Sequence, residues 1–191
     1  MPNAIQGLEA FIEAWDASPP APASSAAATT GESVGPDGQI NLEGSATCQS
    51  AAIFVPSDPS FVGALEPGVR ELCLELIGRL DCVTYSSCQG HRAAEPGGRY
   101  RRRHVGIVPR DQAEASRLED ALERVCSATN RSLPHAVVRV LLVVSQVDGD
   151  LGPRPCFDLE LFGDGVDEDR YFREVELLTR EFLNKLRENF G

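Results

Sequence analysis

The sequence has little tryptophan and tyrosine: its 191 residues include one tryptophan and three tyrosines. It has no apolar run long enough to cross a bilayer, which argues against a helical membrane-spanning protein. No basic segment followed by an apolar stretch stands near its beginning, so we predict no secretory signal peptide. From these absences we expect a cytoplasmic protein that does not bind membranes.

The cysteines lack the regular spacing of a disulfide framework. Several of them fall at positions expected in the core of a helix or strand, which predicts reduced, mostly buried thiols. The six residues are Cys48, Cys73, Cys82, Cys88, Cys126 and Cys156.

Positive charge is scarce as well, since the net charge is −11. Such a chain is not expected to bind nucleic acid or anionic membranes broadly, because phosphate contacts require a positive surface. The exception is the segment 89–104, which contains five arginines and only one acidic residue, Glu95. Two interpretations stay open: a solvated arginine-rich loop, or a rim that binds a phosphate or carboxylate. RNA binding, if present, is expected only at Arg99–Arg103.

Composition divides the chain into three parts. Residues 3–16 predict a short amphipathic helix with Asn3 as its N-cap, which docks on the domain or on a protein partner. Residues 17–50 are rich in Pro, Ala, Ser, Thr and Gly and predict a flexible linker. With 42% hydrophobic residues overall, the rest of the chain, 51–191, is predicted to form a single folded domain.

Within that domain the apolar spacing predicts an α+β fold, a mixed or antiparallel sheet of about five strands with helices packed on it. Pro67 suits the first turn of a helix, and Asp111 with Glu114 resembles a capping box. The last two strands are expected to pair as an antiparallel hairpin. Strands are expected over 51–55, 81–85, 104–108, 136–147 and 154–162, and helices over 67–80, 111–129 and 167–189.

Chemically reactive side chains gather in the stretch 84–91, Thr-Tyr-Ser-Ser-Cys-Gln-Gly-His. We expect a strand to end here in a glycine-containing loop, where backbone N–H groups approach a ligand closely. Cys88 and His91 form a Cys-x-x-His pair, and with Cys82 and His104 they would supply four ligands for zinc. Spacing alone supports this metal site less well than the alternatives.

Two further interpretations of the same stretch concern catalysis and binding. Cys88, beside His91 and the arginines, could be a nucleophile with a lowered pKa, or a thiol that merely packs. The hydroxyls of Ser86 and Ser87 and the N–H groups around Gly90 could hold an anion together with Arg92, or the serines could simply complete the strand end.

Residues 63–77 followed by 84–91 resemble the wybutosine-synthesis tRNA methyltransferase family, whose members run from a helix into a strand ending in a Ser-Ser-Cys-Ser-Gly-Arg loop. Ser86, Ser87, Cys88 and Gly90 match that loop, and the resemblance covers about thirty residues. It implies an α/β fold of that family, S-adenosylmethionine as methyl donor and a modified guanosine in tRNA as substrate.

Two hypotheses about function follow. The first is an enzyme-like protein that binds an anionic small molecule or nucleotide and, as the resemblance implies, transfers a methyl group. Its site residues are His91 and Cys88 as catalytic groups and, as ligand-binding groups, Ser86, Ser87, Gly90, Arg92, Arg101 and Arg103. The second is a non-catalytic adaptor, in which the Cys88/His91 loop is structural or binds zinc and a partner binds the acidic surface and the N-terminal helix.

Overall fold

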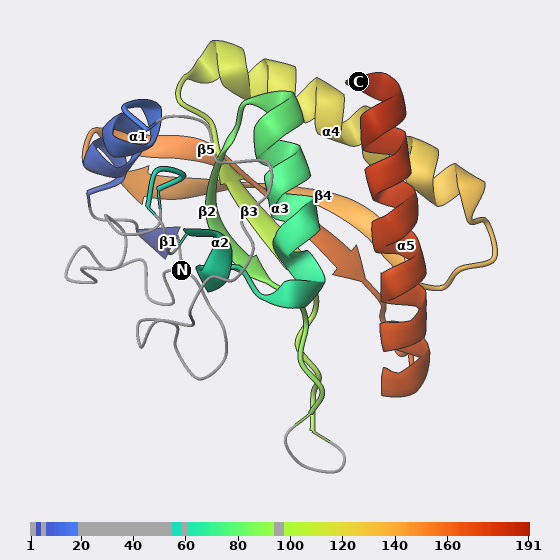
Figure 1. The fold of residues 1–191 in the computed structure, drawn as a ribbon. Coiled ribbons are helices and arrows are strands. Elements are labelled where there is room, and N and C mark those ends of the chain that lie inside the picture. Colours follow the sequence, from blue (N-terminus) through green and yellow to red (C-terminus); the bar gives the residue numbers. More distant parts are fainter. Residues whose placement is uncertain (1–2, 5–6, 19–54, 59–60, 94–97) are drawn as a thin grey trace.

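The computed structural model describes residues 3–4, 7–18, 55–58, 61–93 and 98–191 (Figure 1). This part of the chain contains both helices and strands and is α+β, as predicted. Its elements are β1 (Asn3–Ala4), α1 (Leu8–Asp16), α2 (Phe61–Ala64), α3 (Pro67–Leu80), β2 (Val83–Cys88), β3 (His104–Val108), α4 (Gln112–Ser132), β4 (Arg139–Gly149), β5 (Gly152–Phe162) and α5 (Glu168–Asn189).

The strands form one sheet in the order β1-β4-β5-β3-β2. The four longer strands pair antiparallel with their neighbours, and the two-residue β1 adds to β4 in parallel. The predicted hairpin between the last two strands is confirmed, with Gly149 opposite Gly152 at its turn. Beyond β2 the described parts of the connection to β3 extend away from the sheet as a narrow arm (Figure 1).

The long helices cover the sheet side by side. Helix α3 packs on β2 and β3, α4 packs on β4 and β5, and α5 lies against both α3 and α4 (Figure 1). Alternate residues of β5, Phe157, Leu159 and Leu161, are fully buried, whereas Asp158 and Glu160 between them are only half-buried. The period of two predicted for this strand therefore directs its apolar side chains into the core.

The predicted helix starts are confirmed where a side chain or proline defines them. Asp111 caps α4 by accepting the Glu114 N–H at 2.7 Å, and Asp167 caps α5 by accepting the Arg170 N–H at 2.9 Å. These bonds satisfy N–H groups that lack a partner inside the helix. Pro67 is the first residue of α3, where its missing N–H costs nothing.

The N-terminal prediction is wrong at its beginning. Asn3 is not a helix cap, since it pairs with Val147 in the sheet, and α1 starts at Leu8 after Gly7, whose φ is 73°. Leu8 and Trp15 belong to the same buried core as the sheet, so the apolar stripe of α1 docks within this chain. The apolar face that the adaptor hypothesis offers to a partner is therefore covered.

Two other predictions concern neighbouring parts of the chain. The predicted linker, 17–50, and most of the strand predicted over 51–55 lie outside the described residues. The strand predicted to end at Tyr85 instead continues to Cys88, so Ser86, Ser87 and Cys88 belong to β2 rather than to a loop. Among the described residues no helix combines the length and the apolar composition that crossing a membrane requires.

Candidate metal centre

The chain turns sharply directly after β2. Gly90 adopts a φ of 85°, and His91 then pairs with Arg101, accepting its N–H at 2.8 Å and donating its own to the Arg101 carbonyl at 3.2 Å. A Cβ on Gly90 would lie 3.1 Å from the Arg101 carbonyl oxygen. Positive φ and the close backbone together require glycine here, and the turn brings His91 back beside Cys88.

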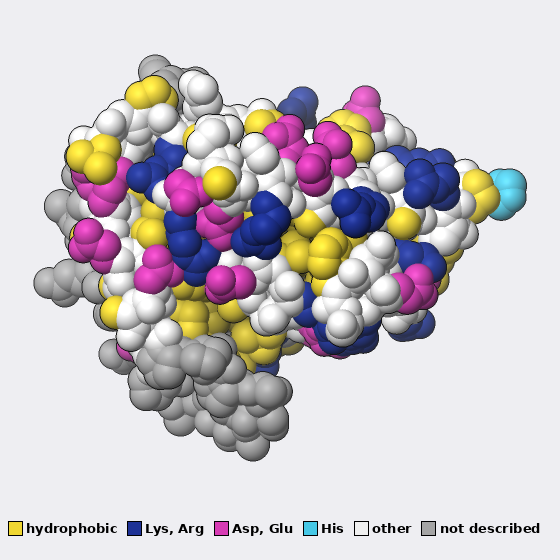
Figure 2. All heavy atoms as spheres, turned by 90° about the horizontal axis from the view of Figure 1, so that it is seen from above, with side chains coloured by type: hydrophobic (Ala, Val, Ile, Leu, Met, Phe, Trp, Pro, Cys, Tyr) yellow, Lys and Arg dark blue, Asp and Glu magenta, His cyan; other side chains and the backbone are white. Residues whose placement is uncertain are grey.

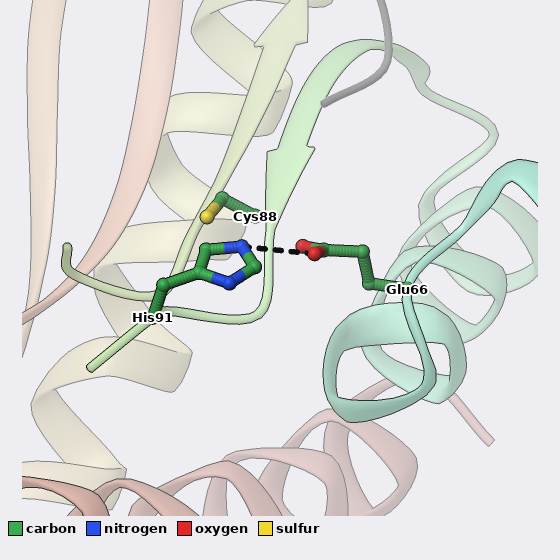
Figure 3. Close-up of side chains that lie close together, drawn as sticks. All are labelled: Glu66, Cys88 and His91. Atoms are coloured by element: carbon green, nitrogen blue, oxygen red, sulfur yellow. Dashed lines mark ion pairs between the residues drawn. The ribbon is translucent and has the colours of Figure 1, made fainter. Parts of the chain in front are cut away.

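Three side chains of different chemistry meet at this turn: Glu66, Cys88 and His91. Glu66 comes from the residue before α3, Cys88 from the end of β2 and His91 from the start of the arm (Figure 3). One ligand atom from each, a carboxylate oxygen, the sulfur and a ring nitrogen, lie within 4.8 Å of one another. In the described part of the chain no other group of three or more such residues is arranged to hold a metal.

The contact between His91 and Glu66 is not an ordinary hydrogen bond. His91 Nε2 lies 2.9 Å from Glu66 Oε1, close enough for an ion pair. The same Nε2 atom is buried, and the contact does not meet the geometry of a hydrogen bond. A nitrogen and an oxygen that lie this close without a hydrogen bond between them are placed to act as two ligands of a third atom.

Backbone N–H groups hold the other two side chains in place. The Gln89 N–H donates to Glu66 Oε2 at 2.7 Å, which leaves Oε1 toward His91. The Gly90 N–H donates to Cys88 Sγ at 3.4 Å. Hydrogen bonds of this kind orient metal ligands and tune their basicity.

The electrostatic prediction for Cys88 is wrong. Burial raises the pKa of the Cys88 thiol, and the Glu66 carboxylate adds to the rise, while the Gly90 N–H and Arg101 offset only part of it. The sequence led us to expect a lowered pKa from neighbouring arginines. The structure instead places a carboxylate beside the sulfur, which disfavours a free thiolate.

Of the four zinc ligands considered from the sequence, only Cys88 and His91 come together. Cys82 directly precedes β2 and is buried at the end of the strand opposite to Cys88. His104 pairs with Cys88 across β2 and β3 but is not among the converging ligand atoms. The third member is Glu66, which the sequence analysis missed. Little in the sequence indicates this residue: it is a carboxylate directly before Pro67, which starts a helix, and it stands 22 positions before Cys88.

The two serines of the predicted anion cradle point to opposite sides of β2. Ser86 pairs with Gly106 and Ser87 with Val105, and successive strand residues alternate between faces. Ser87 is 3% exposed and lies beside Cys73 of α3, whose pKa burial raises to about 12. The two hydroxyls therefore do not converge with the Gly90 N–H.

Arg92, Arg102 and Arg103, which follow the motif, contact other groups of the protein. Arg92 contacts Glu168 and Asp169 at 3.0 and 2.7 Å and lies over the ring of Phe172. The guanidinium carbon of Arg102 lies 4.0 Å from the centroid of the Phe162 ring. Arg102 Nη1 lies 3.7 Å from Glu160 Oε2. Arg103 is buried. Arg99 and Arg101 are exposed, and Arg101 pairs with His91 at the candidate site.

The same mixing of charge extends to another face of the molecule. Seen from the side of α4, Lys and Arg side chains alternate with Asp and Glu, and neither sign forms a continuous patch (Figure 2). A surface of this kind provides no broad field for an anionic polymer.

Comparison of the chain with protein families, with curated proteins and with solved structures gives no match in any of the three.

Proposed function

We propose that this protein binds one zinc ion between Glu66, Cys88 and His91, and that the ion is its functional centre. The observation that carries the proposal is the convergence of Sγ, Nε2 and a carboxylate oxygen, with a buried Nε2 that makes no hydrogen bond. Thiolate, imidazole and carboxylate together are ligands that suit zinc. The sulfur makes magnesium or calcium a poor fit, because those ions take oxygen ligands.

The number of ligands favours a reactive ion over a purely structural one. Structural zinc sites are closed by four protein ligands, whereas catalytic sites use three and keep the fourth position for water or substrate. The described residues supply three. Zinc bound here would lower the pKa of a water in that position to about 7, which supports hydrolysis or addition of water at neutral pH.

The chain's own residues would divide the work. Cys88, 1% exposed, anchors the ion from the buried side, and Glu66, 8% exposed, closes the side toward α3. His91, whose side chain is 30% exposed, lies on the open side, where a water or substrate would arrive. The Gln89 and Gly90 N–H groups hold Glu66 and Cys88 in their ligating orientations.

Metal content and cobalt spectroscopy test this function. The full chain, purified without chelator and then titrated with Zn²⁺ or Co²⁺, should bind one ion, and Co²⁺ should show a thiolate-to-metal absorption band. Cys88→Ala should abolish the band, and His91→Ala should reduce affinity strongly. Glu66→Gln keeps an acceptor for Gln89 but removes the anionic ligand, and should weaken binding.

Matched controls exist for two of these variants. Cys156→Ala removes another buried thiol, on β5, and His135→Ala removes an exposed imidazole; both should bind metal like wild type. Wild-type protein that binds neither ion, or Cys88→Ala that binds as tightly as wild type, would overturn the proposal.

Methyl transfer from S-adenosylmethionine to tRNA, the function implied by the resemblance, stays a prediction, as does a cytoplasmic location. No observation on the described residues favours that reaction over metal binding. Titration with S-adenosylmethionine tests it independently of the zinc experiment.

A further inference from the structure

A buried arginine lies behind the metal centre. Arg103 is 2% exposed, and its side chain makes three hydrogen bonds: Nε to the Gln89 carbonyl at 2.9 Å, Nη1 to Thr179 Oγ1 at 2.9 Å and Nη2 to Glu176 Oε1 at 2.5 Å. Burying a guanidinium is costly unless such partners satisfy it. Two of the partners are on α5 and the third is in the turn that carries the zinc ligands.

The bond to Gln89 acts on the peptide unit that also contacts Cys88. The Gln89 carbonyl and the Gly90 N–H belong to one planar peptide, so fixing the oxygen also fixes the direction of the N–H. That N–H donates to Cys88 Sγ. Arg103 therefore holds one end of a rigid unit whose other end orients the sulfur.

Gln89 also connects this unit to Glu66. Its own N–H donates to Glu66 Oε2 at 2.7 Å, and its side-chain oxygen accepts the Gly68 N–H in the first turn of α3 at 2.9 Å. The packing here is close: a Cβ on Gly68 would lie 2.9 Å from Arg103 Nη2 and 3.0 Å from Gln89 Oε1. Arg103, Gln89 and the start of α3 thus form one contiguous assembly around the ligands.

We propose that Arg103 is a positioning residue of the metal centre, which orients Cys88 and Glu66 through Gln89 and couples metal affinity to the docking of α5. The inference rests on the zinc function proposed above. A residue that only joined β3 to α5 would need no bond to the ligand-bearing turn. Arg103 instead donates its Nε hydrogen to the Gln89 carbonyl.

The test measures two properties, the metal affinity and the position of the thiolate-to-cobalt absorption band. Arg103→Lys keeps the charge but loses the guanidinium fork, and should weaken Co²⁺ and Zn²⁺ binding about 10- to 100-fold, the usual effect of losing a group that orients metal ligands. It should also shift the thiolate-to-cobalt band, because the hydrogen bond to Sγ is no longer held. Arg154→Lys, at the far end of β5, is the control and should leave both unchanged.

A second variant tests the inference even if Arg103→Lys does not fold well enough to be assayed. Glu176 is 62% exposed, so Glu176→Gln should fold while weakening the partner of Nη2. It should lower metal affinity in the same direction by a smaller factor. Glu174→Gln, on the same helix but bonded to Val137 and Val138, should not lower it.

The outcomes separate the two proposals. If wild type binds metal and Arg103→Lys and Glu176→Gln bind it within twofold of wild type, Arg103 is structural only and this inference falls, while the zinc function stands. If wild type binds no metal, the proposed function falls and this inference with it.

Discussion

Trp15 of α1 packs edge-on against Phe61 of α2, with ring centroids 5.7 Å apart and planes at 87°. Phe11 contacts the same indole from its own helix, again with centroids 5.7 Å apart. Trp15 is 5% exposed and belongs to the core that includes the sheet. This aromatic contact joins the N-terminal helix to the rest of the chain.

Replacing Trp15 by alanine should lower the free energy of unfolding by about 3–5 kcal/mol, because a large buried aromatic is lost and leaves a cavity. Urea denaturation followed by circular dichroism measures the loss. Glu13→Ala, on the exposed side of the same helix, should have little effect. Equal urea midpoints for Trp15→Ala and wild type would show that α1 is not docked in solution.

Acid should weaken the junction between α3 and α5. Burial disfavours the Glu75 carboxylate, but hydrogen bonds from Arg187 and Arg79 outweigh this and lower its pKa from the ordinary 4.5. A lowered pKa in the folded state means that the stabilisation is complete above about pH 4.5 and is lost as the pH falls through the folded-state value. Stability should thus fall in acid partly through this carboxyl.

Glu75→Gln should accordingly flatten the acid limb of a plot of unfolding free energy against pH, while lowering stability at pH 7. Glu123→Gln, on the exposed face of α4, should leave the shape of the curve unchanged. Parallel curves for Glu75→Gln and wild type below pH 4.5 would contradict the assignment.

The Tyr171 hydroxyl serves two backbone groups in the core. It donates to the Leu161 carbonyl at 2.9 Å and accepts the Arg103 N–H at 2.8 Å. Burial raises the pKa of Tyr171 to about 12, so the donor is present at neutral pH. Tyr171→Phe leaves a buried N–H unsatisfied and should cost about 1–3 kcal/mol in urea denaturation.

Tyr100→Phe is the control for that change. Its hydroxyl donates to the Gly163 carbonyl at 2.9 Å from a half-buried position, where water can replace it. The loss should therefore be smaller than for Tyr171→Phe. Equal losses for the two variants would show that burial does not set the cost.

The turn at Gly90 should be intolerant of a side chain. Gly90→Ala forces a φ of 85° on an L-residue, at about 1–2 kcal/mol, and brings Cβ to 3.1–3.3 Å from three neighbouring atoms. The displaced turn should lower both the melting temperature and the affinity for Co²⁺. Gly165→Ala also has positive φ, 64°, but open space around it, and should lose stability without losing metal affinity.

Local chemistry allowed much of the fold to be predicted. The capping residues Asp111 and Asp167, Pro67 at a helix start and the strict alternation before Phe162 each act over a few residues, so the sequence displays them directly. The predictions were wrong where pairing with a residue far away in the sequence decides the secondary structure. Asn3 became a strand residue through Val147, and Ser87 stayed in β2 through Val105.

The candidate site likewise combines local sequence features with contacts between distant residues. The sequence by itself determined that a thiol and an imidazole stand three residues apart around a glycine, and the glycine's freedom at positive φ brings Cys88 and His91 together. Only the tertiary structure decided the third member of the candidate site. Glu66 reaches them because α3 packs on β2 and the Gln89 N–H binds its carboxylate, a contact across 23 residues that no local pattern encodes.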